Sequence, residues 1–342
     1  MNPRECFLAA VRNQPTDRPA LGSVTSVATT AAMAVCGAAF PDAHREPHAM
    51  ASLAACASLD AGFDMLCPLF SVVHEAAALG APVDWGDADR MPVITERPWR
   101  SADDIAIPVD FERRESLRVP LAALARLRAE YGREYALVGK VFGPWSLALH
   151  LFGVEPVLLL VLDDPAHLAR ILARLAEATL RSALAQVAAG ADVLCLADHC
   201  SRDLCSPATY RDFVLPLHRQ LVPRIPCPVA LHTCGDTSDR IPAFATSGIT
   251  CFHYDTRVPA ATARALAGER LALMGGVSNV EALLPGDQEV IQAQVRAALS
   301  ARTNIIGPEC AVPLGAPLAG LRGIGRAAQA RVCGMLGPEV SS

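Results

Sequence analysis

Aromatic side chains are scarce in this sequence, at 5% of its 342 residues, and charged residues are few, at 19%. Hydrophobic residues reach 52%, so disorder is excluded for most of the chain and a large core of Ala, Leu and Val can form. The chain is long for one average domain, but strand-and-helix barrels often exceed ~250 residues when they carry insertions. One barrel with additional elements is therefore the simplest expectation.

The sequence also lacks any run of basic residues. Its 30 basic and 35 acidic residues are spread along the chain and give a net charge of −5. No segment is suited to neutralise a phosphate backbone, so the sequence predicts no nucleic-acid partner.

No segment has the composition of a secretory signal or a membrane span. Residues Met1–Arg12 contain charges and no uninterrupted apolar stretch, and the uncharged segment Ala20–Phe40 is rich in Ser and Thr. The sequence therefore predicts a cytoplasmic protein without a membrane partner. Its 12 cysteines are expected to serve metal binding, catalysis or core packing rather than disulfides, because cytosolic thiols are kept reduced.

The simplest nucleotide-binding and serine-hydrolase motifs are missing as well. Neither a Gly-x-x-x-x-Gly-Lys-Ser/Thr string nor a Gly-x-Ser-x-Gly string occurs. The glycine pair in residues 274–278 lacks the Gly-x-Gly-x-x-Gly spacing and the downstream acid of a dinucleotide site, so we interpret it as a tight turn.

Short apolar runs alternate with Ala/Leu-rich helical stretches, the pattern of parallel strands joined by crossover helices. Eight runs favour a closed (β/α)8 TIM barrel of the α/β class, in one domain over residues 1–342. Residues 1–19 are predicted to be a helical extension, and residues 83–99 an inserted hairpin or lid. Helices are expected at Asp164–Ala189 and Gln288–Ala301. The predicted strands are Ala20–Val24, Asp64–Phe70, Ala136–Phe142, Asp192–Asp198, Pro228–His232, Thr250–Tyr254, Leu271–Gly275 and Asn304–Gly307.

A histidine and a cysteine two positions apart end the fifth of these strands. His232 and Cys234 would lie on the same side of the chain at the C-terminal face, where barrel active sites are built. Cys310 follows the eighth strand at the same face, and zinc accepts one imidazole with two thiolates. Three protein ligands with an open fourth position are typical of catalytic zinc, and Asp255 is the candidate for a displaceable fourth ligand.

Other interpretations of these polar residues remain open. Buried cysteines often only pack in a core, and His199, Cys200 and Cys205 form a rival cluster in which adjacent side chains should diverge. Asp198, after the fourth strand, is expected either to orient a substrate or ligand histidine, or to satisfy a helix end or ion pair. His253 and Asn279 also lie on the predicted active face, without an assigned role.

Several motifs spread over nearly the whole chain resemble the uroporphyrinogen decarboxylase superfamily. The general signs are Gly-Pro-Trp-Ser-Leu at 143–147, Ser-Pro-Ala-Thr-Tyr at 206–210 and His-Thr-Cys-Gly at 232–235. Val-Thr-Ser at 24–26, Phe-Pro-Asp-Ala-His at 40–44, Ala-Leu-Gly at 78–80 before Trp-Gly at 85–86, and the distant Cys310 resemble its methylcobamide:coenzyme M methyltransferase branch. The arginine-bearing N-terminal segment typical of the decarboxylases is absent. Glu309 and Ala311 replace the glycines that often flank the distal cysteine in the family.

The resemblance implies a zinc-dependent methyltransferase with His232, Cys234 and Cys310 as ligands. The methyl donor would be a methylcobamide on a separate corrinoid protein, since this sequence contains no Asp-x-His-x-x-Gly element. The acceptor would be a small molecule such as a coenzyme M-like thiol or tetrahydrofolate. Two alternatives remain, a metal-free tetrapyrrole decarboxylase and a non-catalytic metal-binding scaffold of a methyltransfer complex.

Overall fold

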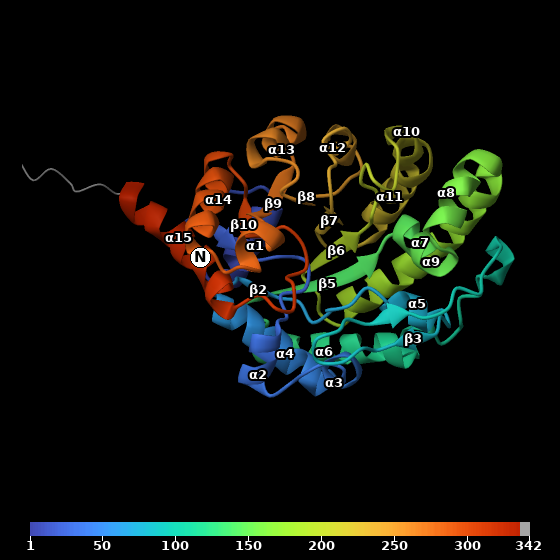
Figure 1. The fold of residues 1–342 in the computed structure, drawn as a ribbon, viewed down its shortest axis with the longest axis horizontal. Coiled ribbons are helices and arrows are strands. Elements are labelled where there is room, and N and C mark those ends of the chain that lie inside the picture. Colours follow the sequence, from blue (N-terminus) through green and yellow to red (C-terminus); the bar gives the residue numbers. More distant parts are fainter. Residues whose placement is uncertain (336–342) are drawn as a thin grey trace, which may run out of the picture.

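Eight parallel strands form the centre of the molecule, and helices surround them (Figure 1). The computed structural model describes the backbone of residues 1–335 and the side chains of residues 1–330, so the last seven residues of the predicted domain lie outside it. The strands follow one another in the order β1-β10-β9-β8-β7-β6-β5-β2. Their bounds are β1 Ala20–Leu21, β2 Met65–Leu66, β5 Ala136–Phe142, β6 Val193–Ala197, β7 Val229–Thr233, β8 Cys251–Tyr254, β9 Ala272–Val277 and β10 Ile305–Pro308. The predicted barrel and all eight of its strands are confirmed.

The first two strands are shorter than predicted, at two residues each. Gly22 follows β1 with φ +152°, and a Cβ there would lie 2.6 Å from Cγ of Met65, so the chain leaves the strand where only glycine fits. Pro68 lies two residues after β2 and has no N–H to donate to a ladder. Between β1 and β2, the amide of Asp64 donates to the Leu21 carbonyl (2.8 Å), and its carboxylate accepts from the Leu21 amide (2.8 Å). This residue therefore bridges the two ends of the sheet.

Fifteen α-helical segments lie within the described residues, and most of them cover the outside of the barrel (Figure 1). The predicted extension contains α1, whose Asn2 and Glu5 form a capping box. Helices α9 and α14 confirm the two helices predicted from apolar spacing. The bounds are α1 Pro3–Val11, α2 Thr30–Cys36, α3 Asp42–Arg45, α4 Pro47–Ala61, α5 His74–Ala78, α6 Glu115–Tyr131, α7 Pro144–Phe152, α8 Val154–Asp163, α9 Pro165–Ala188, α10 Pro207–Thr209, α11 Leu215–Leu221, α12 Ile241–Phe244, α13 Ala260–Ala267, α14 Gln288–Ser300 and α15 Leu318–Met335.

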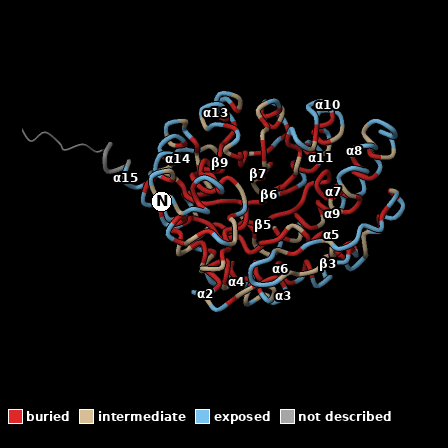
Figure 2. The backbone as a smooth tube through the Cα atoms, in the orientation of Figure 1, coloured by how far each residue is buried: buried red, intermediate tan, exposed pale blue. Residues whose placement is uncertain are grey.

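The core follows the strands. Every residue of the eight barrel strands is buried, because helices cover the outer side of the sheet and side chains fill its interior (Figure 2). Within the described part of the chain, no single helix is long and apolar enough to span a membrane. Only α7 and α8 taken together reach that length and composition, and they meet at a bend of 113°.

The predicted insertion is an antiparallel hairpin outside the barrel. Its strands, β3 Val83–Asp84 and β4 Val93–Ile94, pair Val83 with Ile94 and Asp84 with Val93. Gly86 has φ +74°, and a Cβ there would lie 2.0 Å from the carbonyl oxygen of Arg90, so this tight connection requires glycine.

Candidate metal centre

His232, Cys234 and Cys310 meet at the C-terminal end of the barrel. Sγ of Cys234 lies 3.0 Å from Nε2 of His232 and 2.9 Å from Sγ of Cys310, and the Cys310 sulfur lies 3.3 Å from the same nitrogen. Within the described residues, these form the one group of three or more possible donors whose ligand atoms all lie within 4.8 Å of one another. The three residues predicted from separate strand ends are therefore brought together.

Strand geometry explains this convergence. His232 pairs with Ala197 on β6 and His253 on β8, and Cys234 follows two positions later, so both donors share one side of the chain. Gly235 then turns the chain with φ +92°, and its amide donates to the carboxylate of Asp255 (2.8 Å). The other oxygen of Asp255 accepts from the Arg257 amide (2.9 Å). Asp255 thus braces the Cys234–Gly235 turn and lies outside the three-donor group.

The two thiols share their protons unequally. A hydrogen bond from Cys234 and the nearby His232 hold the pKa of Cys310 well below the ordinary thiol value. The same hydrogen bond, together with burial, raises the pKa of Cys234. One sulfur therefore ionises readily, as a metal ligand must. A tetrahedral ion with bonds of ~2.0–2.3 Å would hold such donors ~3.6–3.8 Å apart, so they need to separate by less than about 1 Å to fit one.

Glu309 fastens the loop that carries Cys310. Its carboxylate accepts hydrogen bonds from the Asn279 amide (2.7 Å), the Thr256 amide (3.0 Å), and the hydroxyls of Ser278 and Thr256. The Asn279 side chain donates in turn to the Ala311 carbonyl (2.7 Å). Both neighbours of Cys310 are thereby tied to the loops after β8 and β9. The sequence placed Asn279 at this face without a role, and here it positions the Cys310 loop.

A neutral histidine lies beside the donor group. Burial and the nearby His232 lower the pKa of His253 to about 3, so its Nε2 carries a proton and donates to the Pro308 carbonyl (2.8 Å). Its ring centroid lies 4.5 Å from that of His232. His253 therefore links β8 to the end of β10 and packs against one of the three donors.

Asp198 points away from the three donors. Its carboxylate accepts from the Ser146 amide in the first turn of α7 (2.7 Å) and lies 2.9 Å from Nε2 of His218 in α11. A Cβ on Gly143 would lie 2.2 Å from this carboxylate, which explains the glycine of the Gly-Pro-Trp-Ser segment. The hydroxyl of Tyr210 lies 3.3 Å from the other nitrogen of His218. Through these contacts Asp198 satisfies the first turn of α7 and is hydrogen-bonded to His218.

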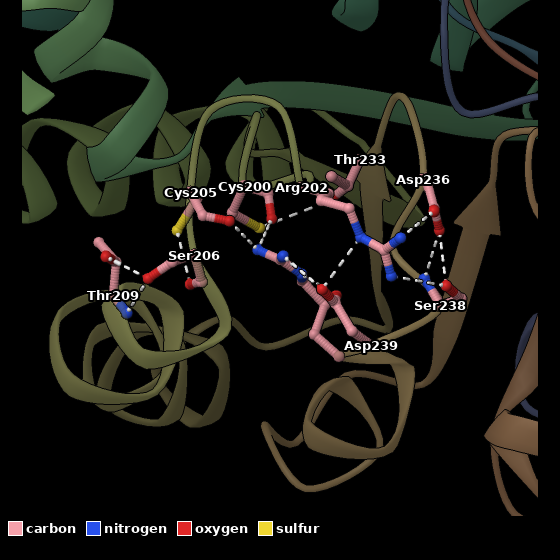
Figure 3. Close-up of polar contacts among 10 residues, drawn as sticks. Cys200, Arg202, Cys205, Ser206, Thr209, Thr233, Asp236, Ser238 and Asp239 are labelled. Carbon is pink, nitrogen blue, oxygen red and sulfur yellow. Dashed lines mark hydrogen bonds and ion pairs between the residues drawn. The ribbon is translucent and has the colours of Figure 1, made fainter.

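The rival cluster of His199, Cys200 and Cys205 does not come together. His199 lines the same cavity as the three donors. By contrast, Sγ of Cys200 contacts the Thr233 hydroxyl (3.6 Å), and Sγ of Cys205 contacts the Ser206 carbonyl (3.6 Å) (Figure 3). The buried guanidinium of Arg240 holds this loop by donating to the carbonyls of Cys200 (2.5 Å) and Cys205 (2.6 Å). These two thiols therefore belong to the packing of the loop after β6.

A cavity of about 220 Å³ opens onto the three donors. Its wall is mostly apolar, and the inserted hairpin contributes Met91 and Pro92. The hairpin therefore covers part of the site, as a lid would. One charged side chain in the wall, Lys140 of β5, was missed by the sequence reasoning, although a lone cation within an apolar strand was a visible signal. The remaining lining residues are Thr25, Phe70, Val72, Phe142, Ala197, His199 and Ala311.

The model of the uroporphyrinogen decarboxylase (URO-D) family matches residues 2–330. The chain belongs to this family. Among relatives within it, a methylated-thiol–coenzyme M methyltransferase of Methanosarcina mazei is 34% identical over 328 residues, covering 96% of this chain and 89% of the relative. The methylcobamide:CoM methyltransferase MtaA of Methanosarcina barkeri is 28% identical, with 93% and 95% covered. A solved methyltransferase structure from Methanosarcina mazei superposes on this URO-D family barrel with a TM-score of 0.94, at 27% identity and 97% and 99% coverage.

Proposed function

We propose that the chain is a zinc-dependent methyltransferase that moves a methyl group from the corrinoid of a partner protein to a small thiol. The observation that carries this proposal is the convergence of His232, Cys234 and Cys310 in the wall of a cavity. The names of the relatives, a methylated-thiol–coenzyme M and a methylcobamide:CoM methyltransferase, support the reaction class.

His232, Cys234 and Cys310 would hold the ion, because one imidazole and two thiolates are a donor set that Zn²⁺ accepts, with a fourth position left for another ligand. Bound there, Zn²⁺ supplies the positive charge that keeps an acceptor thiol ionised near neutral pH, below the ordinary thiol pKa of ~8.5. Asp255 would keep the Cys234–Gly235 turn in position through its hydrogen bond with the Gly235 amide.

The atoms that react are the sulfur of the acceptor and the methyl group on the partner protein's corrinoid. The acceptor sulfur would form a bond to the methyl carbon while the cobalt–carbon bond of the donor breaks, and that bonding electron pair would stay on the donor's cobalt. The apolar wall of the cavity and the hairpin residues Met91 and Pro92 limit the water that reaches the reacting atoms. The corrinoid protein would dock over the C-terminal end of the barrel, where the cavity opens.

The size of the cavity favours a small thiol over a folate. A volume of about 220 Å³ corresponds to roughly seven water molecules at ~30 Å³ each. A short mercapto acid fills such a space, whereas the pterin and aminobenzoyl-glutamate parts of tetrahydrofolate exceed it.

The test is the zinc content of the purified protein and of three variants. Wild type should contain about one zinc per chain, and His232→Ala and Cys310→Ser should lose most of it. Cys205→Ser is the matched control, because the Cys205 sulfur contacts the Ser206 carbonyl and Arg240 and lies outside the three-donor group, and it should keep its zinc. Zinc lost from Cys205→Ser but kept in Cys310→Ser would favour the rival cluster and overturn the assignment.

Activity separates the remaining alternatives. The zinc-loaded protein should demethylate free methylcobalamin when 2-mercaptoethanesulfonate is present, and His232→Ala should not. Zinc binding without turnover of methylcobalamin or a methylated corrinoid protein would favour the scaffold. A tetrapyrrole decarboxylase requires room for four pyrrole rings and several cations for their carboxylates, and Lys140 is the one Lys or Arg in the cavity wall.

A further inference from the structure

Lys140 is the only lysine in the sequence. The chain has 30 basic residues, and all the others are arginines. The residues that form surface ion pairs are accordingly arginines, for example Arg90, Arg174 and Arg302. The single lysine lies instead in β5, where its side chain is only 4% exposed. An ammonium is a compact charge on a flexible stem, and it differs from guanidinium in shape and reach. Lys140 is therefore unusual, because it is the one basic residue in the sequence that is not an arginine.

Strand register places the lysine inside the barrel, beneath the three donors. Gly139 faces outward, because a Cβ there would lie 2.6 Å from the Gln186 side chain of α9, so Lys140 and Phe142 face inward. Phe142 pairs with Ala197, which pairs with His232. Lys140 precedes Phe142 by two residues, a rise of ~6.6 Å along the strand. Its side chain reaches the same cavity that His232, Cys234 and Cys310 line.

The ammonium group has no partner within the described part of the chain. Among the described residues, the hydrogen bonds of Lys140 are those of its backbone, including two with Gln186, and its ammonium takes part in no side-chain hydrogen bond or ion pair. Its charge acts on the buried acid Glu75, whose carboxylate accepts a hydrogen bond from Ser182 (2.9 Å). Its charge also shifts the pKa values of two histidines and two cysteines, none of which is a carboxylate: His44, His74, Cys67 and Cys195. Buried charges are normally paired, so this one awaits a partner from outside the protein.

We propose that Lys140 binds an acidic group of the methyl acceptor, and thereby selects a short thiol that carries a sulfonate or a carboxylate. This inference rests on the proposed function, since it assigns the sulfur of the same acceptor to the metal centre. The acceptor would extend from the three donors at one end of the cavity to the ammonium at the other. A cavity of about 220 Å³ has room for a small molecule of this kind.

The first experiment compares the binding of three thiols to the zinc-loaded protein by titration calorimetry. The probes are 2-mercaptoethanesulfonate, 3-mercaptopropionate and the neutral 2-mercaptoethanol. Wild type should bind one or both acidic thiols at least about tenfold more tightly than the neutral one, as expected for a hydrogen bond between charged groups. Lys140→Met should reduce that ratio to near one, whereas Lys140→Arg should retain part of it. The two acidic probes distinguish a sulfonate site from a carboxylate site.

Chemical labelling tests the same contact without any variant. The primary amines of this sequence that a reagent can acylate are Lys140 and the N-terminal amine, and mass spectrometry measures both in one sample. Saturating 2-mercaptoethanesulfonate should slow the labelling of Lys140 by about fivefold or more and leave the N-terminal amine unchanged. 2-Mercaptoethanol at the same site occupancy should protect much less.

The outcomes separate this inference from the proposed function. Acid-selective binding with protection of Lys140, but no methyl transfer, would support the lysine site and contradict the methyltransferase. Methyl transfer with the same thiol preference in wild type and Lys140→Met would support the methyltransferase and overturn the lysine site. Equal affinity of the wild type for acidic and neutral thiols would also overturn it. Zinc content and the unfolding temperature of each variant show whether it is folded.

Discussion

Glu309 is the residue whose effect on the metal centre can be tested most directly. It lies beside Cys310 and collects hydrogen bonds from the loops after β8 and β9, without being one of the three donors. Outer partners of this kind typically contribute 10- to 100-fold to metal affinity. Glu309→Gln should therefore weaken zinc binding by about tenfold, and Glu309→Ala by more, in competition with a chromophoric chelator. The exposed Glu289 provides the control, and Glu289→Gln should bind zinc as wild type does. Unchanged zinc affinity in Glu309→Ala would contradict the bracing role.

A second prediction concerns the buried acid Glu75. Burial raises its pKa from 4.5 to about 7, although Ser182 and Lys140 oppose the shift. Between pH 4.5 and 7 the unfolded chain loses this proton while the folded protein keeps it, so stability falls as the pH rises through that window. Glu75→Gln removes the titration, and it should stabilise the protein at pH 8 by up to about 3 kcal/mol and have little effect below pH 4.5. Urea unfolding at pH 4.5, 6 and 8 measures this difference, and a benefit that is independent of pH would contradict it.

The relative position of single residues could be predicted where strand ends alone decide it. His232, Cys234 and Cys310 could be placed together because the C-terminal ends of parallel strands meet at one face of a barrel. The direction of the Asp198 side chain could not be predicted from the sequence. A shift of one residue along a strand turns a side chain to the other face, and the partner His218 lies far away in the sequence. The brace at Glu309 depends on loops whose conformation is not encoded in any periodic pattern.

At the scale of elements, the inserted hairpin is expected to control the acceptor. Met91 lines the cavity, and Val93 on the same hairpin is 48% exposed and does not. Met91→Ala should weaken acceptor binding by about fivefold or more, because each buried methylene contributes about 0.8 kcal/mol, and zinc content should stay the same. Val93→Ala is the matched control and should leave the affinity unchanged. Calorimetric titration with 2-mercaptoethanesulfonate measures both, and equal losses in the two variants would indicate a general disturbance of the hairpin.

The element boundaries show which local signals were sufficient. Long apolar runs between helices, such as Ala136–Phe142, predict both ends of the strand correctly. A strand that is buried on both faces can be recognised without alternating polar and apolar residues. β1 and β2 were overestimated, since the apolar sequence continues past Leu21 and Leu66 while Gly22 and Pro68 end the ladder. Asp64 closes the sheet by a hydrogen bond with Leu21, about forty residues earlier in the sequence. No local sequence pattern predicts this contact.

For the whole molecule, the last prediction concerns removal of the metal. The core of eight buried strands and their helices does not depend on the three donors, so the protein should remain folded without zinc. Zinc at about a thousand times its dissociation constant adds about 4 kcal/mol of stability to the folded state. For a chain of this length that corresponds to a rise in unfolding temperature of about 6 °C. Chelation should therefore lower the calorimetric Tm of wild type by about this amount, and leave that of His232→Ala unchanged. A loss of cooperative unfolding on chelation would mean that the metal holds the barrel together, as in small zinc domains. An equal response of wild type and His232→Ala would place the zinc elsewhere.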